Sequence, residues 1–265
     1  MNYRFIIKRP LYSILLVSAM SWYKWENKDK ESYHDDKTRY LTMSLRDKRK
    51  QYDCGHNYST LADIQTWGHF SRTRCPEFEV NHELNEKVSI FVGDITAIEV
   101  DAIVNAADHQ LTGGGGVDAV IHNAAGKHML RLECQTLNGC PTGTSKITGG
   151  YKLPAKYIIH TVGPKGEQPD QLRDAYRSAL DLMGERQLKS IAFPCISTGV
   201  YGYPNEEAAN VALKTVRQWL ESSPHSIHVE RRIYQISNDM VVTVEMRDNH
   251  LDDPYHPYIC SYTQF

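Results

Sequence analysis

Leu111-Thr112-Gly113-Gly114-Gly115-Gly116-Val117-Asp118 is the stretch from which the rest of the chain is best interpreted. Four consecutive glycines leave the backbone N–H groups uncovered, so this backbone can approach a bulky anion such as a phosphate. Apolar side chains then recur at helical spacing, at Val117, Val120, Ile121, Ala124 and Ala125. They predict a helix with one buried face. A glycine loop that opens a helix presents free N–H groups and the positive end of the helix dipole to the same point, which suits a phosphate.

Asp118 stands in the first turn of this predicted helix, where two interpretations are open. As a structural group, it caps the helix or complements the helix dipole, and position alone favours this interpretation. As a functional group, it faces the ligand and binds water or stabilises positive charge that develops on a sugar carbon. The surrounding sequence has to decide between them.

Composition bounds the class of protein. The length of 265 residues and the apolar content of 41% suit one large domain with extensions, or two small domains. A net charge of −2, from 30 basic and 32 acidic residues, speaks against a general nucleic-acid-binding surface. The six cysteines are scattered without a CxxC pair, so we expect no metal site and no disulfide framework, but reduced intracellular thiols.

The amino terminus, residues 1–23, is a candidate targeting segment or an untargeted tail. It contains Arg4, Lys8 and Arg9, no acidic residue, and an apolar run that is short for a membrane span. These features fit a secretory signal, a mitochondrial presequence or a plain tail equally well. The expected location is intracellular, either mitochondrial or in the nucleus and cytoplasm, and no membrane partner is expected.

Residues 24–85 are charged and aromatic and predict an accessory helical extension. Ser44 and Asp47 approximate a capping box, which predicts a helix start. The basic residues behind it, Arg46, Lys48, Arg49 and Lys50, are expected on a solvated face. Leu61, Ile64 and Trp67 lie three apart and are expected to dock on the main body.

The following region alternates strand and helix patterns, which predicts an α/β layered domain. Strands are expected over 87–92, 102–107, 156–162 and 190–196, and helices from Pro169 and from Asn205. A second glycine-bearing loop, Ile196 to Pro204, lies between a strand end and a helix start. Because ligands of α/β sheets bind at the carboxyl ends of the strands, the two loops predict a clamp around two linked phosphates. The alternative for Ser197 and Thr198 is a hydroxyl-capped turn.

Several segments together resemble one family, the macrodomains, and within it the MacroD-type ADP-ribose glycohydrolases. The matching segments are Leu84 to Ser89, Gly93 to Thr96, Glu99 to Ala107, Gly113 to Asp118, Tyr151 to Tyr157, His160 to Pro164 and Phe193 to Gly202. The resemblance implies a three-layer α/β/α fold with a mixed central sheet of about six strands. The macrodomain would cover residues 86–247, and residues 248–265 would form an irregular tail.

The family's site is carried over position by position. Asp94 would accept the adenine amino group as a buried carboxylate, because adenine has a donor where guanine has an oxygen. Asn105 would bond the distal ribose, near Asp118. The candidate catalytic residues are thus Asp118, Asp108 and Asn105. The candidate substrate-binding residues are Asp94, Ile95, Thr96, Ala106, Ala107, Gly113, Gly114, Gly115, Gly116, Val117, Ser197, Thr198, Gly199, Val200, Tyr201, Gly202 and Tyr203.

The resemblance implies a hydrolase that binds ADP-ribose and removes mono-ADP-ribose from acidic residues of modified proteins, and that also deacetylates O-acetyl-ADP-ribose. Its partners would be ADP-ribose and mono-ADP-ribosylated proteins, it would need no cofactor, and we expect a monomer. The alternative is a reader that binds ADP-ribose without turnover. A dinucleotide-dependent dehydrogenase is disfavoured, because the uninterrupted run Gly113 to Gly116 follows a later strand and lacks the G-x-G-x-x-G spacing.

Three departures from the family pattern bear on activity. Asp108 stands where the family usually has Asn, which adds a negative charge near Asp118 and is expected to raise a carboxyl pKa or weaken ligand binding. Ser237 falls at the position of an aromatic residue that lies against the adenine or its ribose. Residues 240–246 are expected to form an additional strand where the family has a helix.

Overall fold

A computed structural model describes residues 33–69, 82–222 and 233–237. The strands are β1 (Ser59–Thr60), β2 (Val88–Val92), β3 (Ile98–Glu99), β4 (Ala102–Ala106), β5 (Ser145–Gly149), β6 (Tyr157–Thr161), β7 (Ile191–Pro194) and β8 (Ile233–Ser237). The helices are one over 33–42, then α2 (Leu45–Arg49), α4 (His82–Asn85), α5 (Gly116–Thr136), α6 (Pro169–Glu185) and α7 (Asn205–Ser222), with short 3₁₀ turns η1 (Leu61–Asp63) and η2 (Ile95–Ala97).

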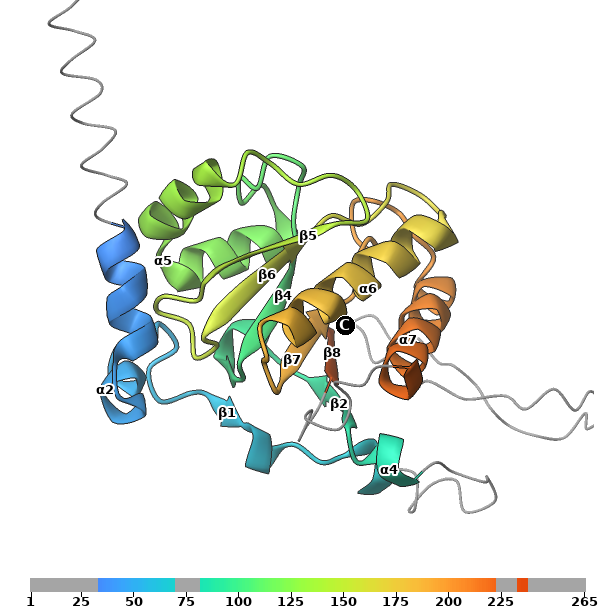
Figure 1. The fold of residues 1–265 in the computed structure, drawn as a ribbon, viewed down its shortest axis with the longest axis horizontal. Helices are drawn as coiled ribbons and strands as arrows, with labels where there is room; N and C mark the ends of the chain where they lie inside the picture. Colours follow the sequence, from blue (N-terminus) through green and yellow to red (C-terminus); the bar gives the residue numbers. More distant parts are fainter. Residues whose placement is uncertain (1–32, 70–81, 223–232, 238–265) are drawn as a thin grey trace, which may run out of the picture.

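The central sheet has six strands in the order β2-β8-β7-β4-β6-β5 (Figure 1). Its pairs are parallel except that of β5 with β6, which is antiparallel. The expected mixed sheet of about six strands is therefore confirmed. The strand β8 lies inside the sheet, between β2 and β7, although it comes last in the described chain.

Helices cover both faces of the sheet, because successive side chains of a strand point to opposite faces. On β4, Ile103 belongs to the apolar cluster that includes Ile121 of α5. Val104 belongs to the opposite cluster, which contains Leu172 of α6 and Trp219 of α7. The three-layer α/β/α arrangement is confirmed, and Asn105, two residues after Ile103, faces α5.

The helix behind the glycine loop begins at Gly116 and runs to Thr136, with a break at Gly126, where φ is +97°. Of its predicted apolar face, Ile121 and Ala125 are buried, whereas Val120 is 41% exposed. The prediction of a helix is confirmed, whereas the predicted burial of Val120 is wrong.

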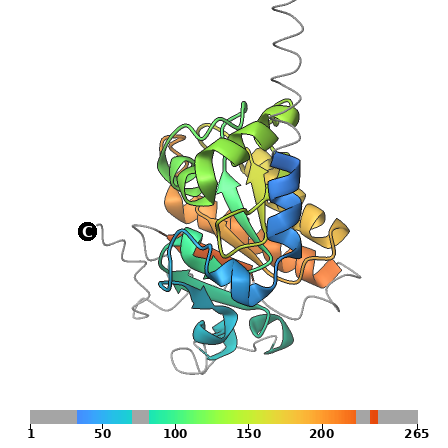
Figure 2. The same ribbon diagram turned by 90° about the vertical axis from the view of Figure 1, so that its left-hand side faces the viewer.

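The extension packs along one side of the domain (Figure 2). Ser44 caps α2 as expected, accepting from the Asp47 N–H. The expected solvated basic face is confirmed for Arg46 and Lys50, which are exposed. It is wrong for Lys48, which is only 5% exposed and donates to the carbonyls of Pro154 (3.3 Å) and Ala155 (2.9 Å). Arg49 pairs with Glu99 at 2.8 Å.

Apolar residues of the extension also dock on the main body. Ile64 is buried in the cluster on the α5 side, and Leu61 packs against it. Tyr40, on the helix over 33–42, meets Tyr151 of the main body edge to face, with the ring centres 6.2 Å apart. The segment 33–69 thus shares the core of the α/β domain, a closer association than the boundary at residue 85 implies.

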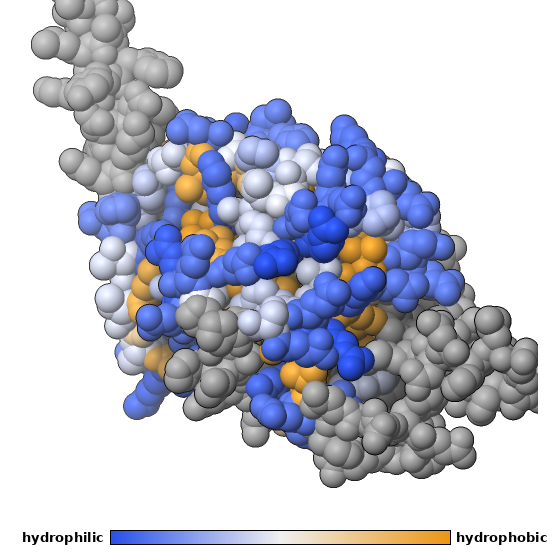
Figure 3. All heavy atoms as spheres, turned by 45° about the vertical axis from the view of Figure 1, so that its right-hand side comes forward, coloured by the Kyte–Doolittle hydropathy of each residue, from blue (hydrophilic) through white to orange (hydrophobic). Residues whose placement is uncertain are grey.

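Several sequence expectations lie outside the described residues. They are the targeting segment 1–23, the strand over 240–246 and the tail 248–265. Among the described helices, none has both the length and the apolar character needed to cross a bilayer. The face seen in Figure 3 is mostly hydrophilic, with apolar patches that stay small and separate.

Candidate active site

Three of the parallel strands, β2, β4 and β7, bring the predicted site residues to one edge of the sheet. The loops that leave the carboxyl ends of β2, β4, β6 and β7 cover residues 93–97, 107–115, 162–168 and 195–204. The glycine loop and the second loop therefore share this edge, as a phosphate clamp requires. The predicted residues Ala106, Ala107, Gly114, Gly116, Val117, Gly199, Val200 and Gly202 all belong to these loops, to the end of β4 or to the start of α5.

Asp118 lies under the glycine loop and is 3% exposed. Its Oδ2 accepts the Gly114 N–H at 2.9 Å, which closes the loop onto the first turn of α5. Its Oδ1 accepts from Nδ2 of Asn105 at 2.7 Å. The structural and functional interpretations are thus compatible, since the same carboxylate holds the loop and lies at the base of the site.

His122 is the residue that sequence reasoning missed. It follows Asp118 by one helical turn, is 1% exposed, and its Nε2 lies 3.4 Å from Asp118 Oδ1. Neither ring nitrogen has a hydrogen-bond partner within the described residues. Burial lowers the pKa of His122, against the opposing effect of Asp118 and Asp108. The spacing i, i+4 from a candidate catalytic carboxylate was the signal available in the sequence.

Asn105 is fully buried and connects Asp118 to a second histidine. Its Nδ2 lies 3.0 Å from His160 Nδ1, and His160 Nε2 lies 2.9 Å from the Thr148 hydroxyl. Burial, with a smaller effect of His122, lowers the pKa of His160 to about 3, so this ring is neutral. Oδ1 of Asn105 has no partner among the described residues, so it is available to accept a hydrogen bond from a ligand.

His122, His160 and Cys134 also bring potential metal-ligand atoms within 4.8 Å of one another. The hydrogen bonds already present oppose coordination. Because His160 Nδ1 accepts from the Asn105 amide, Nε2 carries the proton and faces Thr148. Burial raises the pKa of the Cys134 thiol to about 12, which disfavours the thiolate that a metal would need. The arrangement fits a neutral polar cluster better than a metal site.

Asp108 turns back onto its own loop. It accepts from the hydroxyl and the N–H of Thr112, the latter at 3.1 Å. Partial burial raises the pKa of Asp108, but the hydrogen bonds from Thr112 and from the Gln110 and Leu111 N–H groups outweigh it, and the pKa lies below its usual range. Of the two carboxyls considered, Asp108 is therefore not the one whose pKa is raised, because local donors stabilise its charge.

The first glycine loop contains glycines of two kinds. Gly113 has φ of +75°, and a Cβ there would meet the His122 ring at 2.7 Å, so the fold requires glycine. Gly115 has extended backbone with φ of −166°, and a Cβ there would meet nothing within 4 Å. Glycine at position 115 is thus not needed by the fold and leaves open room beside the backbone.

The second loop follows β7. Ser197 has φ of +68°, is 7% exposed, and its hydroxyl has no partner among the described residues. Thr198 donates to the carbonyl of Cys195 at 3.1 Å. The hydroxyl-capped turn thus holds for Thr198, while the strained backbone and free hydroxyl of Ser197 are typical of a binding position. Gly199, like Gly115, has open space where a Cβ would stand.

The two tyrosines of this loop differ in position. Tyr203 is 2% exposed and belongs to the apolar cluster under α6 and α7. Tyr201 is half-buried, and its carbonyl accepts the Gly166 N–H at 2.7 Å. Burial raises the pKa of Tyr201, and Asp108 and Asp118 add to the effect, so its hydroxyl lies within the field of both carboxylates.

At the end of β2, Asp94 is exposed, not buried as the resemblance implied. Its Oδ1 accepts from the N–H (2.8 Å) and the hydroxyl (2.7 Å) of Thr96. These bonds fix the carboxylate and leave Oδ2 for an external donor. Ile95 is 1% exposed, so only its backbone is available to a ligand.

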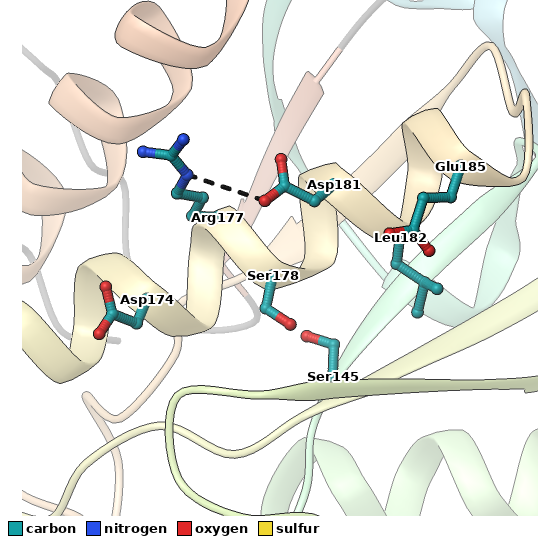
Figure 4. Close-up of a pocket in the computed structure, with 7 residues that line it drawn as sticks. All are labelled: Ser145, Asp174, Arg177, Ser178, Asp181, Leu182 and Glu185. Carbon is teal, nitrogen blue, oxygen red and sulfur yellow. Dashed lines mark ion pairs between the residues drawn. The ribbon is translucent and has the colours of Figure 1, made fainter.

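A separate groove of about 380 Å³ lies between α6 and β5 (Figure 4). Its lining residues are Ser145, Asp174, Arg177, Ser178, Asp181, Leu182 and Glu185. None of them belongs to the loops described above, and Arg177 and Asp181 already pair with each other at 3.7 Å. The groove is distinct from the candidate site.

Comparison with known proteins agrees with this geometry. Residues 104–212 match the family described as Macro domain. The chain is 47% identical over 215 residues to ADP-ribose glycohydrolase MACROD2 of Homo sapiens, covering 76% of this chain and 50% of that protein. It is 50% identical over 202 residues to ADP-ribose glycohydrolase MACROD1 of Rattus norvegicus, covering 72% and 77%.

Among solved structures, the Trypanosoma brucei macrodomain in complex with ADP-ribose matches with a TM-score of 0.63 and 38% identity, over 75% of this chain and 79% of that one. The chain spans about half the length of the MACROD2 proteins that it matches. The identity and coverage of these matches, together with the three-layer fold, show that the chain belongs to the macrodomain family.

Proposed function

We propose that this protein binds ADP-ribose and hydrolyses the bond between mono-ADP-ribose and an acidic residue of a modified protein. The observation that carries the proposal is the pairing of two loops with a buried carboxylate at one sheet edge. At Gly115 and Gly199 neither the backbone angle nor the packing requires glycine. Each of these glycines therefore leaves room for a ligand close to the backbone. Asp118 lies beneath the first of these loops.

Each part of ADP-ribose has a counterpart in the proposal. The first N–H groups of α5 have no partner within the helix and, with the second loop, face the diphosphate. Oδ2 of Asp94 accepts the adenine amine, which distinguishes adenine from guanine. Oδ1 of Asn105 accepts from the distal ribose. The related proteins named ADP-ribose glycohydrolase, and the related macrodomain solved with ADP-ribose, support this assignment.

In the proposed reaction, water adds to C1″ of the distal ribose and the carboxylate of the modified residue leaves. Positive charge grows on the sugar as the bond breaks, and the buried Asp118 carboxylate stabilises it. The attacking water is activated either by Asp118 or by the substrate's own phosphate. O-acetyl-ADP-ribose is proposed as a small second substrate of the same site.

The alternative is a reader that binds ADP-ribose without turnover. The observation that favours it is Asp108, which stands in the glycine loop as a stabilised carboxylate. A carboxylate lacks the two amide donors that would help place the distal ribose for reaction, so turnover is impaired more than binding. The reader is therefore tested together with the enzyme.

The test is release of free ADP-ribose from a glutamate-ADP-ribosylated protein, with ADP-ribose affinity measured by calorimetry. Wild-type chain and Asp108→Asn are compared at equal concentration. Turnover by the wild type, with an increase in Asp108→Asn, supports the enzyme. Binding without turnover in the wild type, restored by Asp108→Asn, identifies a reader, and absence of both binding and turnover rejects the proposal.

A further inference from the structure

Lys165 is a cation at the rim of the candidate site that the proposed reaction does not use. It lies in the loop between β6 and α6 and is exposed. Its Nζ lies 5.5 Å from the centre of the Tyr201 ring, within the range of a cation–π contact. Within the described residues, no carboxylate lies close enough to form an ion pair with it.

The backbone around Lys165 is held from two sides. The next residue, Gly166, donates its N–H to the Tyr201 carbonyl at 2.7 Å, which ties the loop to the second glycine-bearing loop. The Lys165 carbonyl accepts from the Gln168 side chain at 2.9 Å. Gln168 is the N-cap of α6, so the loop is anchored on a helix start. The backbone that carries Lys165 is thus fixed beside Tyr201.

Tyr201 is near both this ammonium group and the carboxylates of the site. Burial raises the pKa of the Tyr201 hydroxyl and Asp108 and Asp118 add to the effect, which indicates that both carboxylates are near this side chain, while Lys165 lies over its ring. In the proposed reaction the bond is broken beside Asp118, so the modified protein leaves the site there. Lys165 is exposed beside Tyr201, where a polypeptide attached to the distal ribose can reach its ammonium group.

We propose that Lys165, held over Tyr201, selects modified proteins whose ADP-ribosylated residue is flanked by acidic side chains. The inference rests on the proposed function, and it adds a preference for the polypeptide. The diphosphate has the N–H groups of two loops available, whereas the ammonium group of Lys165 is exposed and has no ion-pair partner among the described residues, so it is available to the polypeptide. An exposed ion pair is weak, so the preference is about two-fold to five-fold.

The experiment uses two ADP-ribosylated peptides that differ only in their neighbouring residues, Glu in one and Gln in the other. The measured quantity is the ratio of their kcat/KM values with the full chain. Wild type favours the acidic peptide, and the ratio shrinks towards one at 0.5 M salt because the pair is screened. In Lys165→Gln the ratio falls to about one, and in Lys165→Glu it inverts.

Lys214→Gln is the matched control, because Lys214 is an exposed lysine well inside α7 and its replacement makes the same change in charge. It keeps the wild-type ratio. Free ADP-ribose binds Lys165→Gln and wild type with equal affinity. An unchanged peptide ratio in Lys165→Gln overturns the inference. Weaker binding of free ADP-ribose by the same factor also overturns it, since the cation then serves the diphosphate.

Failure of the proposed function would show differently. If wild type releases ADP-ribose from neither peptide, the hydrolase is rejected, and the binding constants of the same two peptides are compared instead. The same two-fold to five-fold preference in binding, lost in Lys165→Gln, then supports the role of Lys165. Equal binding of both peptides by wild type rejects it.

Discussion

Asp118 and His122 lie one helical turn apart, and both are almost fully buried. Burial costs an unpaired charge a great deal, so a carboxylate kept in such a place needs donors, and Asp118 has them in Asn105 and Gly114. His122 has no such partners among the described residues. Its lowered pKa keeps the ring neutral beside the carboxylate at neutral pH.

The state of His122 has a consequence for the pH profile. Because its pKa is lowered, the imidazole stays neutral through the range where an ordinary histidine takes up a proton, near pH 6.5. We predict that the rate of ADP-ribose release from protein shows no inflection near pH 6.5, and that His122→Asn lowers this rate at every pH. A pH–rate profile of both proteins checks this. An inflection near pH 6.5 that disappears in His122→Asn would contradict it.

At the scale of elements, the glycine loop separates fold from ligand binding. Gly113 is confined by its backbone angle and by the His122 ring, whereas Gly115 is confined by neither. One glycine is therefore needed by the fold, and the other leaves the backbone uncovered. This is the pattern expected where backbone must approach an anion. Substitution by alanine distinguishes the two.

We predict that one alanine variant loses stability and the other loses affinity for ADP-ribose. Gly113→Ala strains the backbone and collides with His122, so it lowers the free energy of unfolding by about 2 kcal/mol. Gly115→Ala leaves stability unchanged within about 0.5 kcal/mol but weakens ADP-ribose binding. Urea denaturation and calorimetry measure the two effects. Equal ADP-ribose affinity in Gly115→Ala and wild type would show that no ligand approaches there.

Lys48 shows how the extension is joined to the macrodomain. Burial, with a smaller effect of Lys156, lowers its pKa to about 8 from 10.5, although Glu99 opposes the shift. Between these values the unfolded chain binds more protons than the folded chain. Stability contributed by Lys48 therefore rises as the pH increases from 8 to 10.5.

We predict that the advantage of wild type over Lys48→Met in free energy of unfolding grows over this range. The slope is at most about 1.4 kcal/mol per pH unit, the value for one proton. Urea denaturation of both proteins at pH 7.5 and pH 10 gives the difference. The exposed Lys50, replaced in the same way, is the control and leaves the pH dependence of wild type unchanged. Parallel curves for wild type and Lys48→Met would contradict the prediction.

The limits of sequence reasoning are clearest in elements whose identity depends on distant neighbours. The apolar faces of α6 and α7 follow from spacing alone, and their predicted core positions, from Leu172 to Trp219, are buried. The strand β5 was not predicted, because Ser145–Gly149 is short and polar and is defined by antiparallel pairing with β6. Lys48 was misplaced for a similar reason, since its burial depends on carbonyls that lie over 100 residues away.

The two loops of the candidate site were predicted, and so were the buried Asp118 and Asn105, whereas the buried His122 and His160 were missed. Glycine runs and strand ends identify the two loops, because those features are local. The partners of Asp108 and the exposure of Asp94 depend on how each loop folds back, which neither spacing nor resemblance contains. The roles of the site residues, the domain limits and the intracellular location stay predictions.

At the scale of the whole molecule, the sheet depends on its last described strand. Within the described residues, β2 pairs with β8 alone in this sheet, and β8 also pairs with β7. We predict that a chain ending at Ser222 loses cooperative unfolding, because β2 and Asp94 behind it lose their support. Thermal unfolding of this truncated chain and of the full chain measures it. Cooperative unfolding of the truncated chain near the wild-type midpoint would contradict this strand order.

The most direct measurement is the single-turnover rate of ADP-ribose release from a glutamate-modified protein by Asp118→Asn, alongside its affinity for free ADP-ribose. Asparagine keeps the shape of the side chain and removes the charge beneath the glycine loop. We predict a rate at least about 100-fold below wild type, with ADP-ribose affinity within a few-fold. A rate close to wild type, or equal losses of rate and affinity, would contradict this. The carboxylate would then serve only to hold the loop.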